Sequence, residues 1–214
     1  MESIYFYKLT HDNGGAPCVQ DGLFSLAICK PMIRRTARPQ SVIFGFAANS
    51  LHADNRLIYV ARITDKVGDG DYFTKEEFRR RGDCIYERHG DRFVWRQGAR
   101  HHGPDDLVHD LGEYPTYHKA SVLLSDDFRY FGGSGSADYK ARYLLIKDAV
   151  EGLGRGHRVY HDELLRLQLE SLMRRVWNET GERMAGVSTS EPRRAACHRS
   201  RSCGVIKDTG PTKR

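Results

Sequence analysis

Four cations lie together in one short segment that contains no acid. Lys30, Arg34, Arg35 and Arg38 fall within nine residues, and none of those nine is Asp or Glu. Guanidinium groups form two-point hydrogen bonds with phosphate oxygens. The segment is therefore a candidate for holding the phosphate of a nucleotide or of a nucleic acid. The alternative is a solvated basic turn without a ligand.

A histidine and an aspartate come directly after the first predicted strand. His11 and Asp12 precede the pair Gly14-Gly15. Loops at strand ends are where a rigid scaffold presents functional side chains. A carboxylate beside a histidine can transfer protons or hydrogen-bond to the edge of a base. The alternative is a turn-forming aspartate next to a surface histidine.

A long polar segment, 98–118, is rich in histidine and aspartate and has no apolar periodicity. We predict a mobile loop, because segments of this length in compact domains are usually functional or flexible. Its titratable residues are His101, His102, His109, His118, Asp105, Asp106 and Asp110. A metal needs three or four converging ligands. No two of these histidines are spaced i, i+4, and Gly103-Pro104 argues against a helix, so we predict no metal site.

Aromatic side chains at strand ends could stack on a base, as they do in proteins that bind single strands or flipped bases. Tyr7, Tyr86 and Trp95 are candidates, and Gln97 and His101 could read base edges. For any one of the aromatic residues, a place in the core is the favoured alternative.

The overall composition indicates a cytoplasmic protein. No basic-then-apolar leader opens the chain, and no apolar run approaches the roughly 18 residues of a membrane span, so we predict no membrane association. The five cysteines are an odd number without a CxxC pair, which favours free thiols in a reducing compartment. Cys197, His198 and Cys203 give only a weak metal signal.

The positive charge is concentrated at the C-terminal end. Of the formal charge of +6, residues 181–214 carry +5, and residues 1–180 carry only +1. The end segment is also poor in apolar residues, so we predict one domain over 1–180 and a basic, disordered tail over 181–214. The domain itself presents no large surface for tracking phosphates. It is better suited to local contacts with one nucleotide.

The order of predicted elements indicates an α+β fold. Strands are expected at 4–9, 42–48, 57–63, 84–88, 92–96, 121–125 and 128–131, a short helix at 71–81 and a long helix at 162–178 with Asp162 as its N-cap. Segments 23–29 and 144–146 fit either strand or helix. Because strands come first and one long helix closes the domain, we expect mixed, mostly antiparallel sheet rather than an alternating parallel one.

Several blocks of the sequence resemble the nucleotide modification associated domain 2 family of bacteria and phages. The blocks are 7–17, 26–37, 82–86, 95–101 and 122–132, and they follow one another in the family's order. The resemblance implies a role in making or handling modified bases. The family pattern favours Asn where this chain has Cys84, which puts any role of position 84 in doubt. The strand order also resembles small barrels of the PUA and EVE type, which implies a barrel or curved sheet with flanking helices.

Two functions follow, and we favour the first. The domain is a module that binds a modified base of a nucleic acid, DNA more than RNA, or of a nucleotide. His11, Asp12, Gln97 and His101 would read the base, Tyr86 would stack on it, and Lys30, Arg34 and Arg35 would hold the phosphate. The alternative is an enzyme that modifies a nucleotide or base, with His11 and Asp12, or His101 and Asp110, transferring protons. A third, blander option is a scaffold whose basic tail alone contacts nucleic acid.

No catalytic set of nucleophile, base and orienting group can be read from the spacing. Motifs typical of NTPases, dinucleotide-binding domains, α/β-hydrolases and zinc peptidases are absent from the sequence. We therefore predict no cofactor, and the sequence leaves the oligomeric state open.

Overall fold

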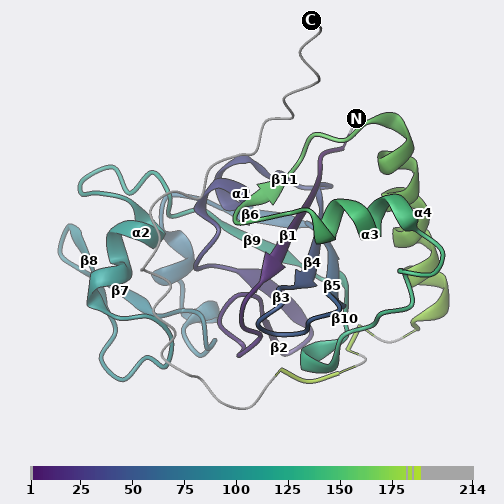
Figure 1. Cartoon of the computed structure of the whole chain (residues 1–214). Helices are drawn as coiled ribbons and strands as arrows, with labels where there is room; N and C mark the ends of the chain where they lie inside the picture. The colour runs from purple at the N-terminus through teal and green to yellow at the C-terminus, as the bar shows by residue number, and fades with distance from the viewer. Residues whose placement is uncertain (1, 182, 185, 189–214) are drawn as a thin grey trace, which may run out of the picture.

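The computed structural model describes residues 2–181, 183–184 and 186–188. The strands are β1 (Ile4–Leu9), β2 (Cys18–Gln20), β3 (Leu23–Leu26), β4 (Val42–Ala47), β5 (Leu57–Arg62), β6 (Asp65–Val67), β7 (Tyr86–His89), β8 (Arg92–Trp95), β9 (Val122–Ser125), β10 (Asp127–Tyr130) and β11 (His157–Arg158). The α-helices are α1 (Pro31–Thr36), α2 (Leu107–Leu111), α3 (Leu144–Glu151) and α4 (Glu163–Glu179), and the single 3-10 turns are η1 (Asp71–Phe73), η2 (Glu76–Phe78), η3 (Pro104–Asp106) and η4 (Gly132–Ser134) (Figure 1).

The strands form two main sheets and one hairpin. The first sheet has the order β10-β5-β4-β1-β11, and the second has the order β2-β3-β9-β6. Every pair is antiparallel except β1 with β4. Mixed, mostly antiparallel α+β structure is thus confirmed. The expected barrel is not, because within the described residues the strands form separate open sheets and no pairing closes them into a ring.

The first sheet buries both of its faces. In β1, Ile4 and Phe6 point to one side, and Tyr5, Tyr7 and Leu9 point to the other, as the two-residue period of a strand requires. One side packs on α3 and α4, and the other packs on the second sheet. This double burial explains why β1 and β4 are almost continuously apolar.

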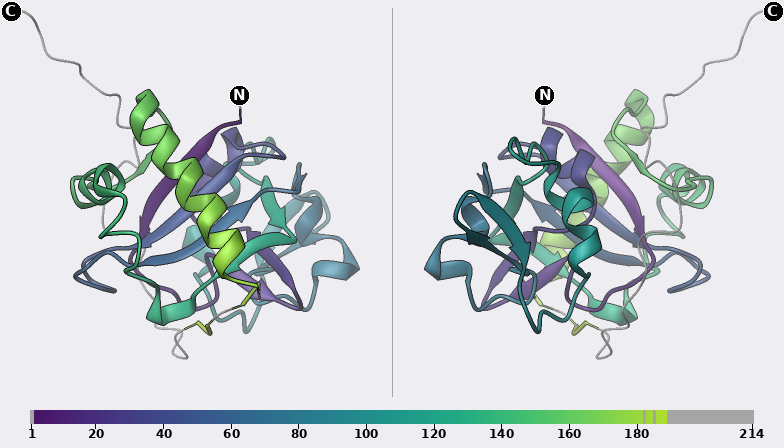
Figure 2. Two further views of the ribbon diagram at one scale, coloured as in Figure 1. Left: turned by 90° about the vertical axis from the view of Figure 1, so that its right-hand side faces the viewer. Right: turned by 90° about the vertical axis from the view of Figure 1, so that its left-hand side faces the viewer.

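Helix α4 crosses the outer face of the first sheet (Figure 2). The Asp162 carboxylate accepts a hydrogen bond from the Leu165 N–H at 2.8 Å, which confirms the predicted N-cap. Leu165, Leu169 and Leu172 are buried on its inner stripe. The segment that begins at Leu144 resolves as helix, not strand, and completes the layer.

Residues 67–120 form a lobe on the far side of the second sheet (Figure 1). The lobe holds η1, η2, the β7–β8 hairpin, η3 and α2 around a separate apolar core. The hairpin was predicted correctly. Two other predictions were wrong: 71–81 forms two 3-10 turns rather than one helix, and 98–118 contains a helix, α2, rather than loop alone.

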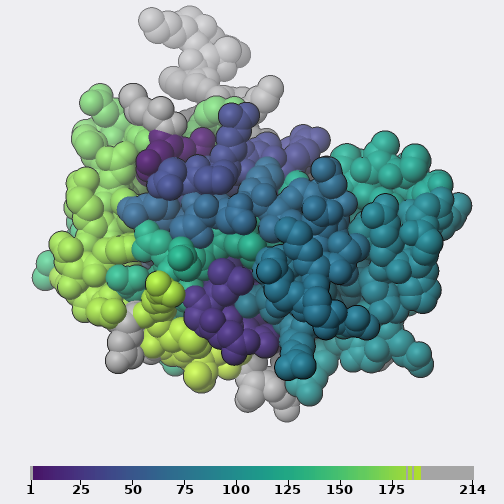
Figure 3. All heavy atoms as spheres, turned by 180° about the vertical axis from the view of Figure 1, so that it is seen from behind, coloured from purple at the N-terminus to yellow at the C-terminus, as the bar shows by residue number. Residues whose placement is uncertain are grey.

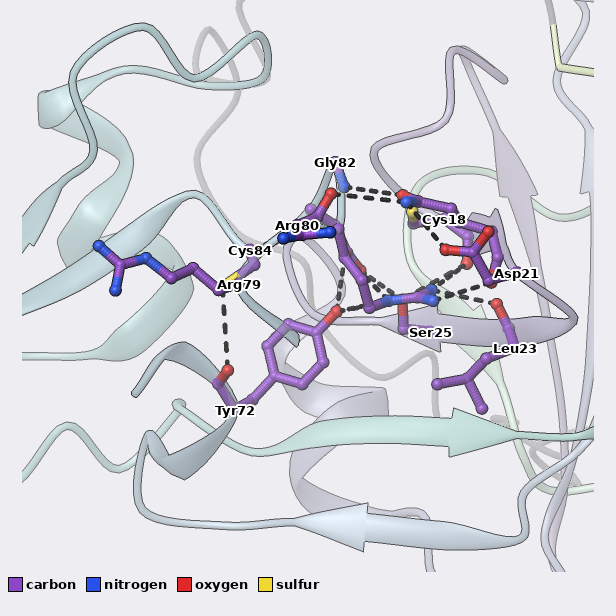
Figure 4. A network of polar contacts seen from close by, with 12 residues as sticks. Cys18, Asp21, Leu23, Ser25, Tyr72, Arg79, Arg80, Gly82 and Cys84 are labelled. Atoms are coloured by element: carbon purple, nitrogen blue, oxygen red, sulfur yellow. Dashed lines mark hydrogen bonds and ion pairs between the residues drawn. The ribbon is translucent and has the colours of Figure 1, made fainter. Parts of the chain in front are cut away.

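Arg81 ties the lobe to the second sheet through a buried polar network. Figure 4 shows this network around Tyr72, Ser25 and Leu23. The Arg81 guanidinium donates to the Tyr72 hydroxyl, the Ser25 hydroxyl and the carbonyl oxygens of Cys18, Gln20 and Leu23. The Asp83 carboxylate accepts from Ser25 and Tyr72. Arg81 is buried and therefore holds the fold together at this point, whereas its neighbours Arg79 and Arg80 are exposed.

The first residues beyond α4 return to the first sheet. Tyr130 N–H donates to the Arg183 carbonyl at 2.9 Å, and Gly133 N–H donates to the Val187 carbonyl at 2.9 Å. Arg183 also donates to the Gly22 carbonyl between β2 and β3. Figure 3 shows yellow C-terminal atoms beside purple N-terminal ones. Described residues of 181–188 are thus part of the packed body, whereas the rest of the predicted tail lies outside the described residues. None of the helices that the structure describes has the length and apolar character to cross a membrane.

Candidate functional site

A sharp turn between β3 and α1 presents Cys29. Cys29 has φ 56° and Lys30 has φ 42°, and α1 starts at Pro31. Positive φ is uncommon for residues other than glycine, and such strain gathers at functional sites. The arrangement resembles the strained strand-to-helix turn that carries the nucleophile in α/β-hydrolases. Cys29 is partly exposed, whereas Cys18 and Cys84 are buried.

A histidine and an aspartate line up behind the Cys29 sulfur. His102 Nε2 lies 3.2 Å from Cys29 Sγ, and His102 Nδ1 lies 2.6 Å from Asp110 Oδ2. Since an ionised carboxylate only accepts hydrogen bonds, Nδ1 carries a hydrogen and donates to Asp110. Nε2 then faces the sulfur and can take its proton. These contacts link a nucleophile, a base and an orienting group one after another in space.

The Asp110 carboxylate is fully buried and accepts three donors. Besides His102, it accepts the Cys29 N–H at 2.8 Å and the Tyr86 hydroxyl at 2.8 Å. Burial alone would raise the pKa of this carboxyl. The His102 hydrogen bond and charge, together with the Arg34 charge, hold it below its usual range instead. Asp110 therefore stays ionised and can stabilise a positive charge on His102.

Arg34 fixes the backbone around this triad from inside the protein. Its guanidinium donates to the carbonyl oxygens of Cys29, Asp110, Lys119 and Ser121, each at 2.7 Å. Arg34 is 0% exposed. These contacts argue against the predicted phosphate contact for Arg34, because its donors face the protein's own carbonyl groups and no solvent reaches them.

Tyr86 is also interior. It is 0% exposed and donates its hydroxyl to Asp110, so it orients the triad's carboxylate. This position does not fit the predicted stacking on a base. Burial, followed by the charge of Asp110, raises the Tyr86 pKa far above its usual value, and the phenol stays protonated as a hydrogen-bond donor.

A second buried polar cluster adjoins the nucleophile. Tyr59 donates to the Tyr7 hydroxyl at 2.9 Å, and Tyr130 donates to Asp12 Oδ2 at 2.8 Å. Burial raises the Tyr7 pKa, and the charges of Cys29 and Asp12 raise it further, so Tyr7 lies within electrostatic reach of both. Burial raises the pKa of Asp12 to about 6. A carboxyl group with that pKa can exchange protons near neutral pH.

The other predicted site residues occupy three kinds of position. Lys30 follows the nucleophile, with its ammonium 4.7 Å from the centre of the Tyr7 ring. His101 is 9% exposed, and its ring packs on Gly15, where a Cβ would come within 2.8 Å of it. His11, Arg35 and Gln97 are exposed. The structure thus brings Lys30, Arg34 and Tyr86 to the triad, whereas His11, Arg35 and Gln97 lie on the surface.

Burial lowers the pKa of His101, which favours a neutral ring. The alternative acid–base pair predicted from sequence, His101 with Asp110, gains no support from the hydrogen bonds that Asp110 accepts. The neighbouring residue, His102, is the histidine whose Nδ1 lies 2.6 Å from Asp110 Oδ2. Among the described residues, no group of three or more His, Cys, Asp or Glu side chains is arranged to hold a metal ion.

Sequence reasoning did not assign Cys29 or His102 to a catalytic set. Cys29 is 73 residues from His102 and 81 from Asp110, so only the folded chain brings them together. A signal was present, because a cysteine separated by a single residue from a helix-starting proline suggests a strand-to-helix turn. A histidine-rich segment elsewhere in such a chain is a reason to look for a base.

Comparison with known proteins places the chain in a family. The family model described as nucleotide modification associated domain 2 matches residues 1–179. Searches of curated proteins and of solved structures gave no significant match. The matched range contains the whole triad and both buried polar clusters. The chain belongs to the nucleotide modification associated domain 2 family.

Proposed function

We propose that this protein is a thiol-dependent enzyme of nucleotide modification, with Cys29 as its covalent nucleophile. The observation that carries the proposal is the contact of His102 Nε2 with Cys29 Sγ at 3.2 Å while His102 Nδ1 holds the buried Asp110. A thiol becomes a strong nucleophile when a positioned base takes its proton. The family's name supplies the setting of nucleotide modification.

The reaction class that suits this triad is acyl transfer at an amino group of a nucleotide or base. His102 takes the Cys29 proton, and the sulfur attacks the acyl carbon to form a carbon–sulfur bond. The carbon–nitrogen bond then breaks as His102 returns the proton to the leaving amine. In the second half, His102 deprotonates an incoming amine or water, which attacks the thioester and releases Cys29.

Three further residues have supporting roles in this proposal. Asp110 keeps His102 in the tautomer that accepts from sulfur, and Tyr86 orients Asp110. Lys30, next to the nucleophile in the chain, is the predicted cation best placed to meet the phosphate of a nucleotide. A thiol that must stay reduced also favours the cytoplasm.

The binding module favoured from sequence has less support than the enzyme. Two of its parts, Arg34 and Tyr86, are interior and hold the triad together. Base reading by His11, Asp12, Gln97 and His101 stays a prediction, as does the preference for DNA over RNA.

The test measures the reactivity of Cys29 and then its acylation. Alkylation by iodoacetamide, followed against pH by peptide mass spectrometry, should give Cys29 an apparent pKa below the ordinary value of about 8.5. His102→Ala should return that pKa to about 8.5 or above. Cys18 and Cys84 serve as internal controls, because burial raises their pKa values to about 12 and about 11.

Incubation with N4-acetylcytidine and N6-acyl adenosines should then add the mass of an acyl group to the chain. The adduct should map to Cys29 and be absent from Cys29→Ala. An ordinary Cys29 pKa that ignores His102, or acylation that persists in Cys29→Ala, would refute the proposal.

A further inference from the structure

The β7–β8 hairpin borders a hollow of about 340 Å³, a size typical of ligand sites. One wall comes from the segment after η1 and includes Lys75 and Arg79, and the other comes from β7 and includes Arg88 and His89. Arg96, just after β8, completes the lining. The hollow lies in the lobe of residues 67–120, on the opposite side of the molecule from α3 and α4 (Figure 1).

The lining carries an excess of positive charge. Four of its side chains are Lys or Arg, and Glu87 is its acid. Glu87 lies 3.2 Å from His89, and outside the lining Glu76 lies 3.3 Å from Arg79. The Arg79 and Glu76 side chains are 62% and 80% exposed, so solvent screens that pair and leaves Arg79 available to a stronger anion.

Two of the guanidinium groups are held in place by the protein. Arg96 donates to the carbonyl oxygens of Arg79 at 2.7 Å and of Cys84 at 3.0 Å. The Arg88 guanidinium lies 5.4 Å from the centre of the Phe93 ring. A cation that is already positioned loses less conformational freedom when it binds an anion. The hollow is thus prepared for anionic groups before any ligand arrives.

We propose that this hollow binds the phosphate groups of a nucleic-acid strand. Its cations stand on two walls at the surface, an arrangement that suits several phosphates along a backbone better than the single phosphate end of a free nucleotide. Cationic contacts with phosphates hold and orient a strand without reading its sequence. The small net charge of the domain does not oppose phosphate binding, because the four cations are concentrated around the hollow.

The hollow and the triad share one residue. Tyr86 lines the hollow and also donates its hydroxyl to Asp110. A strand held here lies on the lobe that carries His102 and Asp110. The inference thus deepens the proposed function by making the substrate polymeric, and that step alone rests on the proposed function; the binding of phosphates does not require Cys29.

The experiment compares two full-length variants with the same loss of charge. The hollow variant is Lys75→Gln/Arg79→Gln/Arg88→Gln. The matched control, Arg142→Gln/Arg155→Gln/Arg174→Gln, changes three exposed arginines around α3 and α4. Fluorescence anisotropy with a labelled 20-nucleotide single strand, at several salt concentrations, measures affinity. The hollow variant should bind at least tenfold more weakly, with a salt slope lower by about 2, since each phosphate contact on a single strand contributes about 0.7.

The remaining arms separate the alternatives. The control variant should lose less than threefold, and Cys29→Ala should bind as the unchanged protein does. Equal losses in the two variants, or none in the hollow variant, would refute the hollow as the binding site. Competition by micromolar mononucleotide would show a nucleotide site instead of a strand site. If strand binding follows the prediction while Cys29 proves unreactive, the proposed function fails and the phosphate site stands.

Discussion

One carboxylate organises the reactive end of this molecule. The Asp110 carboxylate accepts hydrogen bonds from the Cys29 backbone N–H, from the Tyr86 hydroxyl and from His102, so its two oxygens set both the position of the nucleophile and the tautomer of the base. Asp110 is fully buried, so water does not compete with these donors for its oxygens. The reactivity of the Cys29 thiol therefore depends on Asp110, which acts on the thiol through the His102 ring and the Cys29 backbone N–H.

Replacing that carboxylate should raise the pKa of Cys29. In Asp110→Asn, an N–H₂ group replaces one of the two accepting oxygens. If it faces Cys29, the backbone N–H loses its acceptor; if it faces His102 Nδ1, it favours the tautomer with the hydrogen on Nε2. A ring in that state cannot take the thiol proton. We expect alkylation of Cys29 at pH 7 to slow by about tenfold or more, as a shift of one pKa unit requires. Asp105→Asn, at an exposed position of the same segment, should leave the pH profile unchanged. An unaltered profile in Asp110→Asn would contradict the assigned role.

Asp12 should give the stability a pH dependence of its own. Its folded pKa of about 6 lies above the ordinary 3.8, so below pH 3.8 both states are protonated and no penalty exists. As the pH rises from 3.8 to 6, the unfolded chain ionises first and the folded state loses stability. Above pH 6 the penalty is constant at about 3 kcal/mol, from 1.36 kcal/mol per pKa unit.

Asp12→Asn removes this group while keeping an acceptor for the Tyr130 hydroxyl. Urea unfolding should therefore show the variant gaining stability, relative to the unchanged protein, between pH 4 and pH 7.5 by up to about 3 kcal/mol. Asp126→Asn, at an exposed position, provides the control. The same stability difference at both pH values would mean that Asp12 ionises normally.

At the scale of elements, the nucleophile turn is held by α1 and not by its own sequence. Arg34 and Arg35 are neighbours on α1, yet Arg34 is 0% exposed and Arg35 faces solvent. The sequence predicted the basic cluster but could not divide it, because side-chain direction on a six-residue helix depends on where the helix docks. Arg34 points inward and joins the carbonyl groups of three separate segments, at Cys29, at Asp110 and at 119–121.

This difference predicts opposite outcomes for two adjacent substitutions. Arg34→Met leaves buried carbonyl groups of Cys29, Asp110, Lys119 and Ser121 without their donor. We expect a loss of about 3 to 5 kcal/mol and a fall in Tm of about 10 °C or more. Arg35→Met should change stability by no more than about 0.5 kcal/mol. Differential scanning calorimetry measures both, and similar Tm values for the two variants would contradict the structural role of Arg34.

The elements predicted well were those whose own pattern decides their structure. β1, β4 and β5 are long and apolar, and α4 has a capped stripe, so local preference and burial agree. Helix α2 is five residues long and has no stripe, and it forms because Leu111 and Asp110 are buried against the lobe and α1. Its existence is a tertiary effect. The triad could not be predicted for the same reason, since Asp110 lies on α2 and His102 lies in the segment just before η3.

At the scale of the whole molecule, the layers separate stability from chemistry. α3 and α4 cover one face of the first sheet, the second sheet packs on the other, and the lobe with His102 and Asp110 lies beyond the second sheet. The sequence predicted the long strands and the closing helix α4, but it predicted neither the short elements β2, β6, β11, α1 and α2 nor this stacking. Sheet closure depends on which distant strands pair, and the parallel pairing of β1 with β4 and the edge strand β11 left no local signal.

Two leucines on opposite layers test this separation. Leu169 on α4 and Leu111 on α2 are both 0% exposed, so each change to alanine should cost about 2 to 5 kcal/mol. Leu169→Ala should leave the alkylation pKa of Cys29 unchanged, because both sheets stand between α4 and the lobe. Leu111→Ala removes packing beside Asp110 and should raise that pKa or broaden the profile. Urea unfolding first measures the stability of each variant. Alkylation is then compared under conditions in which both variants are folded. An equal shift of the Cys29 pKa in both would show that the thiol responds to global stability and that the lobe does not position it independently of the helical layer.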